Sequence, residues 1–197
     1  MPSDLTAEIA AVAARLVVEE GMEYGPAKRR AARSLARRAV RPADLPSNEE
    51  VENEVRTHLT LFHADTQPAE LAALRRVAAQ WMTRLAPFRP HLTGAVWRGT
   101  ATRLNSVHLQ LYCDDSKSAE LALIDLGVDY EVGSLPGPRG EPVDVLSVAS
   151  RSDELGELVT VHLSVLDHDD LRGALKPDAR GRSQRGDLAA LRGLIGP

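Results

Sequence analysis

The chain has 197 residues, with 28 acidic and 24 basic side chains and a formal net charge of −4. This charge excludes a globally electropositive nucleic-acid coat, so any binding of polyanions has to come from a local patch. Apolar residues make up 43% of the chain, which is enough for a hydrophobic core, and the single cysteine, Cys113, excludes a disulfide framework and a cysteine-based zinc cluster.

Hydropathy and cysteine usage also bear on location. No apolar run approaches the roughly 20 residues that a membrane-spanning helix needs, because Arg15 interrupts the best candidate, residues 9–18. The N-terminal sequence lacks the basic start and the apolar middle of a signal peptide. We therefore expect a cytoplasmic protein in a reducing compartment, with no membrane as a partner.

The first 88 residues are typical of helices. Apolar positions at helical spacing predict a first helix that ends at Gly21, and Pro26 is suited to the first turn of a second helix, over residues 26–41. Ser47 and Glu50 form a capping-box pattern that predicts the start of a third helix. A fourth helix is predicted from about residue 68 to residue 85.

The third helix carries two histidines, His58 and His63. They are five residues apart, and residues on one helix face recur at intervals of three or four. The spacing therefore predicts that these two side chains do not share a face.

After Pro90 the hydrophobic period changes from helical to alternating. Residues 106–113 alternate strictly, which predicts a half-buried strand with Ser106 and His108 on its polar face. The rest of the chain predicts a helix over 114–126, strands over 128–132, 143–148 and 158–166 with a Pro/Gly hairpin at 135–140, and a final helix over 186–194. The predicted fold class is α+β, with a mixed sheet in residues 67–197 and a helical N-terminal region over 1–66.

One segment resembles the signature of the nucleotidyltransferase superfamily of the DNA polymerase beta type. In that family a Gly-Ser turn and an Arg-Gly pair precede a strand that bears Asp-x-Asp. Here Gly94 is followed by Arg98-Gly99 at the matching position, and Ser106 and His108 lie twelve and fourteen residues after Gly94. The resemblance covers residues 68–170 and implies a nucleotidyltransferase-like mixed sheet.

The family's chemistry is metal-assisted phosphoryl transfer. Two strand carboxylates and a third from a neighbouring strand hold two Mg²⁺ ions, and the Gly-Ser turn contacts the phosphates. In this chain Ala95 replaces the serine of the turn, and Ser106 and His108 replace the aspartates. These side chains are poor ligands for Mg²⁺. The resemblance therefore implies the fold and a degenerate catalytic site at Ser106, His108 and a third position.

Two residues compete for the third position. Asp144 matches the family's last motif but shares its strand face with apolar residues, whereas His162 lies on the polar face of an alternating strand, which favours His162 as the third catalytic position. If their strands pair, His108 and His162 approach one another. They could then bind Zn²⁺, Ni²⁺ or Co²⁺ with Asp144 as third ligand, act in acid-base chemistry, or be hydrogen-bonded surface residues without a metal.

The resemblance also implies contacts to a nucleotide or another phosphorylated small molecule. They fall on the turn and the residues after it, and on the basic stretch 172–185 beside the implied cleft: Gly94, Ala95, Arg98, Gly99, Thr100, Lys176 and Arg180. The basic stretch can equally be a surface arm held by ion pairs to Asp167, Asp169 and Asp170.

The predicted helix over residues 26–41 is rich in arginine. At 100° per residue Arg30, Arg33, Arg37 and Arg41 form one stripe, which can bind the phosphates of a nucleic acid or be a solvated face beside acidic neighbours.

The sequence thus supports three functions: binding of a phosphorylated ligand without Mg²⁺-dependent transfer, catalysis with a histidine-ligated transition metal, and nucleic-acid binding through the predicted helix over residues 26–41.

Overall fold

The computed structural model describes residues 4–35, 41–178 and 180–196. The chain divides into two compact units. The helical unit comprises Met1–Ala69 with the segment Thr100–Asn105, and the sheet unit comprises Glu70–Gly99 with Ser106–Pro197. No helix among the described residues is both long enough and apolar enough to span a membrane.

The helical unit is built around α1 (Asp4–Glu20), which packs against α2 (Tyr24–Leu35) and α3 (Asn48–Phe62). Small side chains on α2 let the helices approach closely, while branched residues of α1 and α3 fill the core. Its buried members include Ile9, Ala13, Val17, Ala27, Ala31, Val51 and Val55. The capping box at α3 is confirmed: the Ser47 hydroxyl accepts from the Glu50 amide at 3.1 Å, and the Ser47 amide donates to Glu50 Oε2 at 2.7 Å.

The arginine-rich segment differs from the predicted helix over 26–41. The described helix α2 covers Tyr24–Leu35, and Arg37 lies outside the described residues. Arg41 is extended (φ −70°, ψ 149°) and precedes the short 3₁₀ helix η1 (Pro42–Asp44). Pro42 accounts for this, because a residue before proline avoids helical geometry. The predicted stripe is therefore wrong at Arg41.

The described residues of the sheet unit form six strands in the order β3-β4-β5-β2-β1-β6. Only β2 and β5 run parallel, and the other neighbours are antiparallel, so the sheet is mixed and the α+β class is confirmed. The strand bounds are β1 (His91–Thr93), β2 (Val107–Cys113), β3 (Tyr130–Pro136), β4 (Pro142–Ser152), β5 (Glu157–Asp167) and β6 (Arg185–Gly186).

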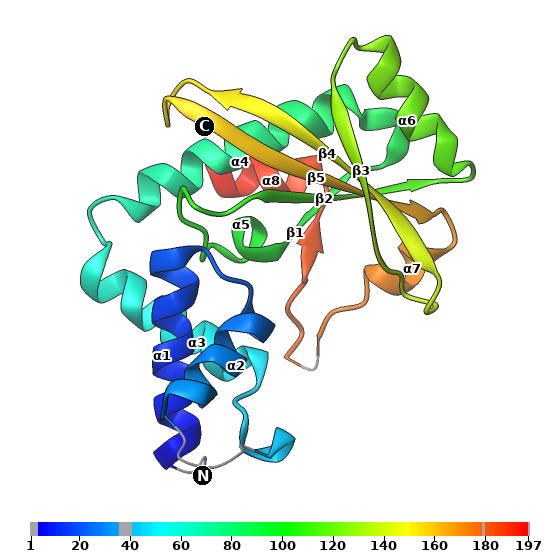
Figure 1. Cartoon of the computed structure of the whole chain (residues 1–197). Helices are drawn as coiled ribbons and strands as arrows, with labels where there is room; N and C mark the ends of the chain where they lie inside the picture. The colour runs from blue at the N-terminus through cyan, green and yellow to red at the C-terminus, as the bar shows by residue number, and fades with distance from the viewer. Residues whose placement is uncertain (1–3, 36–40, 179, 197) are drawn as a thin grey trace. The chain divides into compact units, whose positions relative to one another are not determined.

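Helices cover one face of this sheet. In Figure 1, α4 (Gln67–Arg84) and α8 (Leu188–Ile195) lie on the same side of the strands. On this face Leu92, Leu109 and Leu163 are fully buried. α6 (Ser116–Asp125) lies in the connection from β2 to β5, where parallel strands need a long crossover.

The strand expected before a turn at Gly94 is present as β1, whereas α5 (Gly94–Arg98), α7 (Asp170–Ala174) and β6 are missing from the sequence-based prediction. Each has five residues or fewer, too few to display a period. The hairpin also differs, since β3 extends to Pro136, which pairs with Pro142. The turn is confined to the residues between them, where the Gly137 amide donates to the Glu141 carbonyl at 2.8 Å.

Candidate functional site

The face of the sheet opposite the apolar face carries polar side chains of β2 and β5, beside the buried Val145 and Leu166. Strands β2 and β5 pair in parallel with His108 opposite His162, so both imidazoles leave the sheet on the same side. Their ring centroids are 5.0 Å apart, with 31° between the ring planes. The two strands therefore pair, which was the condition for His108 and His162 to approach one another. We call this side of the sheet the polar face.

Residues of neighbouring elements lie close to the two rings, Ser147 beside His162 and Gly94 beside His108. Ser147 of β4 pairs with His162, and its hydroxyl oxygen is 2.8 Å from Nδ1 of that ring. Gly94 begins α5 directly after β1, with φ +75°, and a Cβ built on it lies 3.6 Å from His108 Cδ2. The positive φ favours glycine at this position, and its backbone lies close to the His108 ring.

Arg185, the last residue of the basic stretch 172–185, also belongs to this face, although it was not among the ligand residues predicted individually. Strand β6 pairs with β1 and places Arg185 opposite Thr93. The guanidinium Nη1 donates to Gln110 Oε1 at 2.6 Å and to the Tyr112 hydroxyl at 3.3 Å. Its buried Nε has no hydrogen-bond partner among the described residues. The sequence placed the basic stretch 172–185 beside the implied cleft, but it could not single out Arg185, because β6 has only two residues and shows no alternation.

The surroundings of Arg185 are largely desolvated. Tyr112 is 1% exposed, and its hydroxyl donates to Gln110 at 3.0 Å. Burial raises the pKa of the Tyr112 phenol, against the opposing effect of Arg185. The carboxylate of Asp170 also raises the pKa of this phenol. Arg185 is half-buried, and a partly desolvated cation attracts anions more strongly than an exposed arginine does.

The proposed third ligand, Asp144, lies on the opposite side of the sheet. Ser147 shares a face with His162, and successive residues of a strand alternate, so Asp144 lies on the side of Leu146. The prediction that Asp144 could join His108 and His162 in one metal site is therefore wrong. On the polar face of the described strands the acidic residue is Glu131, exposed on the edge strand β3 and paired with Ser147.

The grouping of side chains that can bind metals also leaves Asp144 apart from His108 and His162. Among the described residues, three His, Cys, Asp or Glu side chains come close enough to share an ion at one place, Glu19 with His58 and His63. His108 and His162 therefore have no third ligand of these types in that part of the chain. Ser106 precedes the first residue of β2 and is half-buried.

The remaining residues of the implied phosphate turn lie in α5 or cap it. Arg75 of α4 donates to the carbonyls of Val96 at 3.2 Å and Trp97 at 3.3 Å, so a guanidinium caps the C-terminal end of this short helix. Burial lowers the pKa of Arg75. Gly99 is the C-cap residue, with φ +82°, and its amide donates to the Ala95 carbonyl.

Arg98 and Thr100 have different surroundings. Arg98 is half-buried in the last turn of α5. Thr100 is 3% exposed and begins the segment Thr100–Asn105, which belongs to the helical unit. The structure therefore groups Gly94, Ala95, Arg98 and Gly99 in the sheet unit and separates Thr100 from them.

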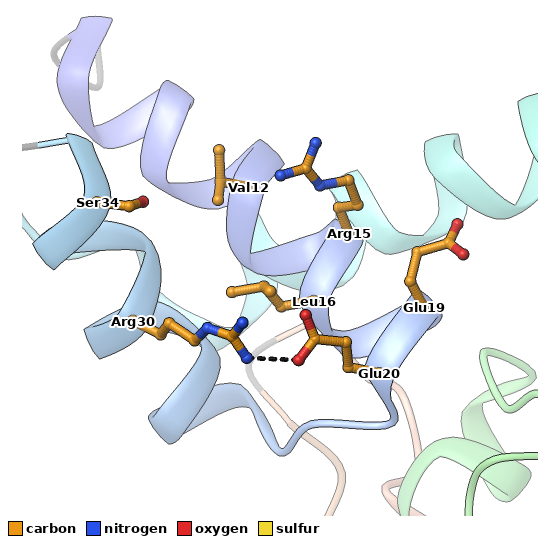
Figure 2. A pocket seen from close by; sticks show the side chains of 7 residues that line it. All are labelled: Val12, Arg15, Leu16, Glu19, Glu20, Arg30 and Ser34. Carbon is orange, nitrogen blue, oxygen red and sulfur yellow. Dashed lines mark hydrogen bonds and ion pairs between the residues drawn. The ribbon is translucent and has the colours of Figure 1, made fainter.

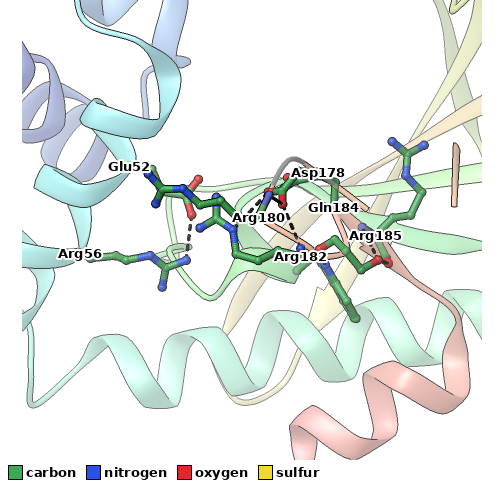
Figure 3. A network of polar contacts seen from close by, with 9 residues as sticks. Glu52, Arg56, Asp178, Arg180, Arg182, Gln184 and Arg185 are labelled. Carbon is green, nitrogen blue, oxygen red and sulfur yellow. Dashed lines mark hydrogen bonds and ion pairs between the residues drawn. The ribbon is translucent and has the colours of Figure 1, made fainter. Parts of the chain in front are cut away.

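The C-terminal basic stretch is organised by its own acidic residue, Asp178. Figure 3 shows Arg182 and Gln184 converging on its carboxylate, at 3.1 Å and 2.8 Å. The amides of Arg180 and Arg182 donate to the other carboxylate oxygen, each at 2.9 Å. These contacts hold the pKa of Asp178 below its usual value, mainly through the Arg182 amide.

The stretch was predicted to form ion pairs with Asp167, Asp169 and Asp170. Among the described contacts, its side chains and amides instead bind the Asp178 carboxylate. Asp170 instead pairs with Arg139 of the β3–β4 hairpin at 2.9 Å. Lys176 and Arg180 are exposed.

Part of the arginine stripe is already paired. Figure 2 shows Arg30 of α2 directed at Glu20 of α1, with which it forms an ion pair. The pair lines an open pocket of about 340 Å³ together with Val12, Arg15, Leu16, Glu19 and Ser34. Arg41 pairs with Asp44 at 2.8 Å, and Arg33 is exposed. Local carboxylates thus offset much of the charge that would attract a polyanion.

The helical unit holds a second histidine pair. Glu19 Oε1 is 2.9 Å from His58 Nε2 and 3.1 Å from His63 Nε2. The two histidines were predicted not to share a helix face, yet both reach Glu19, because His63 is the C-cap of α3 (φ −131°, ψ 16°) and lies outside the regular helical spacing. Hydrogen bonds from His58 and His63 lower the pKa of Glu19, so its carboxylate is charged at neutral pH.

No protein-family model matches this sequence, and comparison with curated proteins and with solved structures finds no similar protein. The site is therefore argued from its own geometry.

Proposed function

We propose that the polar face binds a nucleotide or another phosphorylated small molecule, on a nucleotidyltransferase-like scaffold that lacks Mg²⁺-dependent transfer activity. The observation that carries the proposal is the gathering of His108, His162 and Arg185 on one face of adjoining strands. Gln110 and Ser147 add neutral hydrogen-bonding groups beside them. Imidazole, hydroxyl and guanidinium groups are suited to phosphate oxygens.

The order of elements supports the scaffold part of the proposal. A glycine turn after β1, a short helix, and a strand that starts near Ser106 follow the arrangement expected from the resemblance. The position of the third carboxylate in that family falls on a neighbouring strand, and here His162 lies on β5 beside His108. The correspondence is one of position, since none of the three side chains is a carboxylate.

The donor set does not fit the Mg²⁺ ions of that family. Mg²⁺ favours carboxylate and water oxygens in octahedral geometry, and it is a poor partner for imidazole. Ser106, His108 and His162 supply no negative charge, and Arg185 adds a positive one on the same face. The same face can bind the anionic ligand directly, without a bridging metal.

The two alternative functions have less structural support. A histidine-ligated transition metal at this face has only His108 and His162 as ligands among the described residues, since Asp144 projects from the other face. Nucleic-acid binding through α2 would use Arg30, which is paired with Glu20.

Ligand binding is tested by calorimetric titration of the full chain with ATP, GTP, CTP and UTP, with and without Mg²⁺. We expect binding in the absence of Mg²⁺, weakened about tenfold or more in Arg185→Gln and in the double variant His108→Ala, His162→Ala. Arg76→Gln is the matched control, because Arg76 pairs with Glu154 away from the polar face. Absence of binding by all four nucleotides, or unchanged affinity in the variants, would contradict the proposal.

Transfer is tested separately with labelled nucleotides, Mg²⁺ and a set of acceptors. We expect no transfer by the unmodified protein, because the face lacks the carboxylates that would neutralise two Mg²⁺ ions. The variant Ser106→Asp, His108→Asp serves as the comparison that restores two of them. Robust Mg²⁺-dependent transfer by the unmodified chain would falsify this part of the proposal.

A further inference from the structure

We propose that Glu19, His58 and His63 form a binding site for a divalent transition metal ion of the Zn²⁺ type in the helical unit. Their ligand atoms, one carboxylate oxygen and two imidazole nitrogens, all lie within 4.8 Å of one another. We call these three residues the His-Glu cluster. It shares no residue with the polar face, so it is independent of the function proposed above.

The distances suit a tetrahedral ion. Zinc binds histidine nitrogen and carboxylate oxygen at about 2.0–2.2 Å, which places neighbouring ligand atoms roughly 3.3 Å apart. The Glu19 oxygen already lies 2.9 Å from His58 Nε2 and 3.1 Å from His63 Nε2. A small outward movement of the exposed Glu19 side chain therefore makes room for an ion. Two histidines and a glutamate, with water in the fourth position, are an established ligand set for zinc.

The backbone around the cluster is well defined. His63 closes α3 through a bond from its amide to the Leu59 carbonyl at 2.9 Å, and its own carbonyl accepts from the Gln67 amide at 2.9 Å. The His58 ring lies against Phe62, with ring centroids 4.7 Å apart. Glu19 is in the last turn of α1, which packs on α3. Ligands carried by packed helix ends are preorganised for a metal.

The charge around the cluster also favours a cation. Glu19 is in the last turn of α1, and His58 and His63 lie on either side of the last turn of α3, so the cluster is near the negative ends of both helices. Figure 2 shows the Glu19 carboxylate directed away from Arg30, which is occupied by Glu20. Glu19 is thus the carboxylate left available to a metal at this end of α1.

The bound ion would link the C-terminal ends of α1 and α3. It would replace the hydrogen bonds that the two imidazoles now make with Glu19, and it would leave one coordination position to water. Since the site belongs to the folded arrangement, metal binding is expected to stabilise the folded chain.

The experiment is a titration of the chelator-treated full chain with Zn²⁺ by calorimetry and with Co²⁺ by visible absorption. We expect one ion per chain, Co²⁺ bands of a tetrahedral nitrogen-oxygen site, and a melting temperature raised by Zn²⁺. Each of Glu19→Gln, His58→Gln and His63→Gln is expected to weaken Zn²⁺ binding about tenfold or more and to abolish the increase in melting temperature.

The control is the double variant His108→Ala, His162→Ala, which removes the other histidine pair and is expected to bind Zn²⁺ as the unmodified chain does. Circular dichroism of each variant confirms that it folds. Failure of the unmodified chain to bind Zn²⁺ at micromolar concentration would overturn the inference, and so would binding that is lost in the control but kept in the cluster variants. Neither outcome bears on nucleotide binding at the polar face.

Discussion

At the scale of single residues, Gly186 shows how one missing side chain shapes the edge of the sheet. A Cβ at this position would lie 2.2 Å from Trp97 Cη2 and 2.3 Å from Cζ3. The indole is held in place, because its Nε1 donates to the Ser183 carbonyl at 2.9 Å. Trp97 therefore packs against β6 at Gly186, and β6 places Arg185 on the polar face.

We predict that Gly186→Ala destabilises the protein by about 1–3 kcal/mol, because the added methyl group overpacks against the Trp97 ring. Denaturant unfolding followed by circular dichroism measures the change. The control is Gly193→Ala in α8, where a Cβ meets no atom within 4 Å. This substitution should stabilise the chain by up to about 1 kcal/mol through helix propensity. Equal stability of Gly186→Ala and the unmodified chain would contradict the packing argument.

At the scale of elements, the capping box of α3 links local sequence to helix geometry. Glu50 accepts from the Ser47 amide, and this contact lowers its pKa from the ordinary value of 4.5. The negative charge also lies in the first turn of the helix, where the macrodipole favours it. The pattern was readable in the sequence because every partner lies within three residues.

We predict that Glu50→Gln makes stability less dependent on pH in the acidic range. A depressed carboxyl pKa contributes stability in full above the unfolded value of 4.5, and this contribution is lost as the pH falls through the lower folded pKa. The variant should therefore be less stable than the unmodified chain at pH 7, by less than about 1 kcal/mol. Near pH 2 the two should converge.

Denaturant unfolding at a series of pH values checks this, with Glu54→Gln in the same helix as control. A difference between Glu50→Gln and the unmodified chain that stays constant from pH 7 to pH 2 would refute the assignment.

At the scale of the whole molecule, the distribution of charge determines how strongly the chain can bind a nucleic acid. The net charge is −4, and the described part of the arginine segment has local acidic partners at Arg30 and Arg41. A surface of this kind releases few counterions on binding a phosphate backbone.

We predict no retention of duplex DNA or RNA by the full chain at about 0.15 M salt, and weak retention at low salt that Arg30→Ala with Arg33→Ala reduces further. Filter binding across a salt series measures both. Tight binding at physiological salt with a steep salt dependence would contradict the prediction and return attention to the stripe that includes Arg37, outside the described residues.

Much of the fold follows from the sequence alone, for reasons that are local. Periodicity located the long helices and β2, β4 and β5, because burial of one face imposes a period on each element. The matching alternation of residues 106–113 and 158–166 also anticipated that His108 and His162 would meet on one face if their strands paired.

The rest was decided by the tertiary structure, because it depends on which elements become neighbours. Register placed Ser147 beside His162, and a two-residue strand brought Arg185 beside Gln110, a residue 75 positions away in the chain. The end of α3 turned His63 out of the helical spacing and toward Glu19. Periodicity within one element carries no information on these contacts, since each joins segments distant in sequence or begins where a regular element stops.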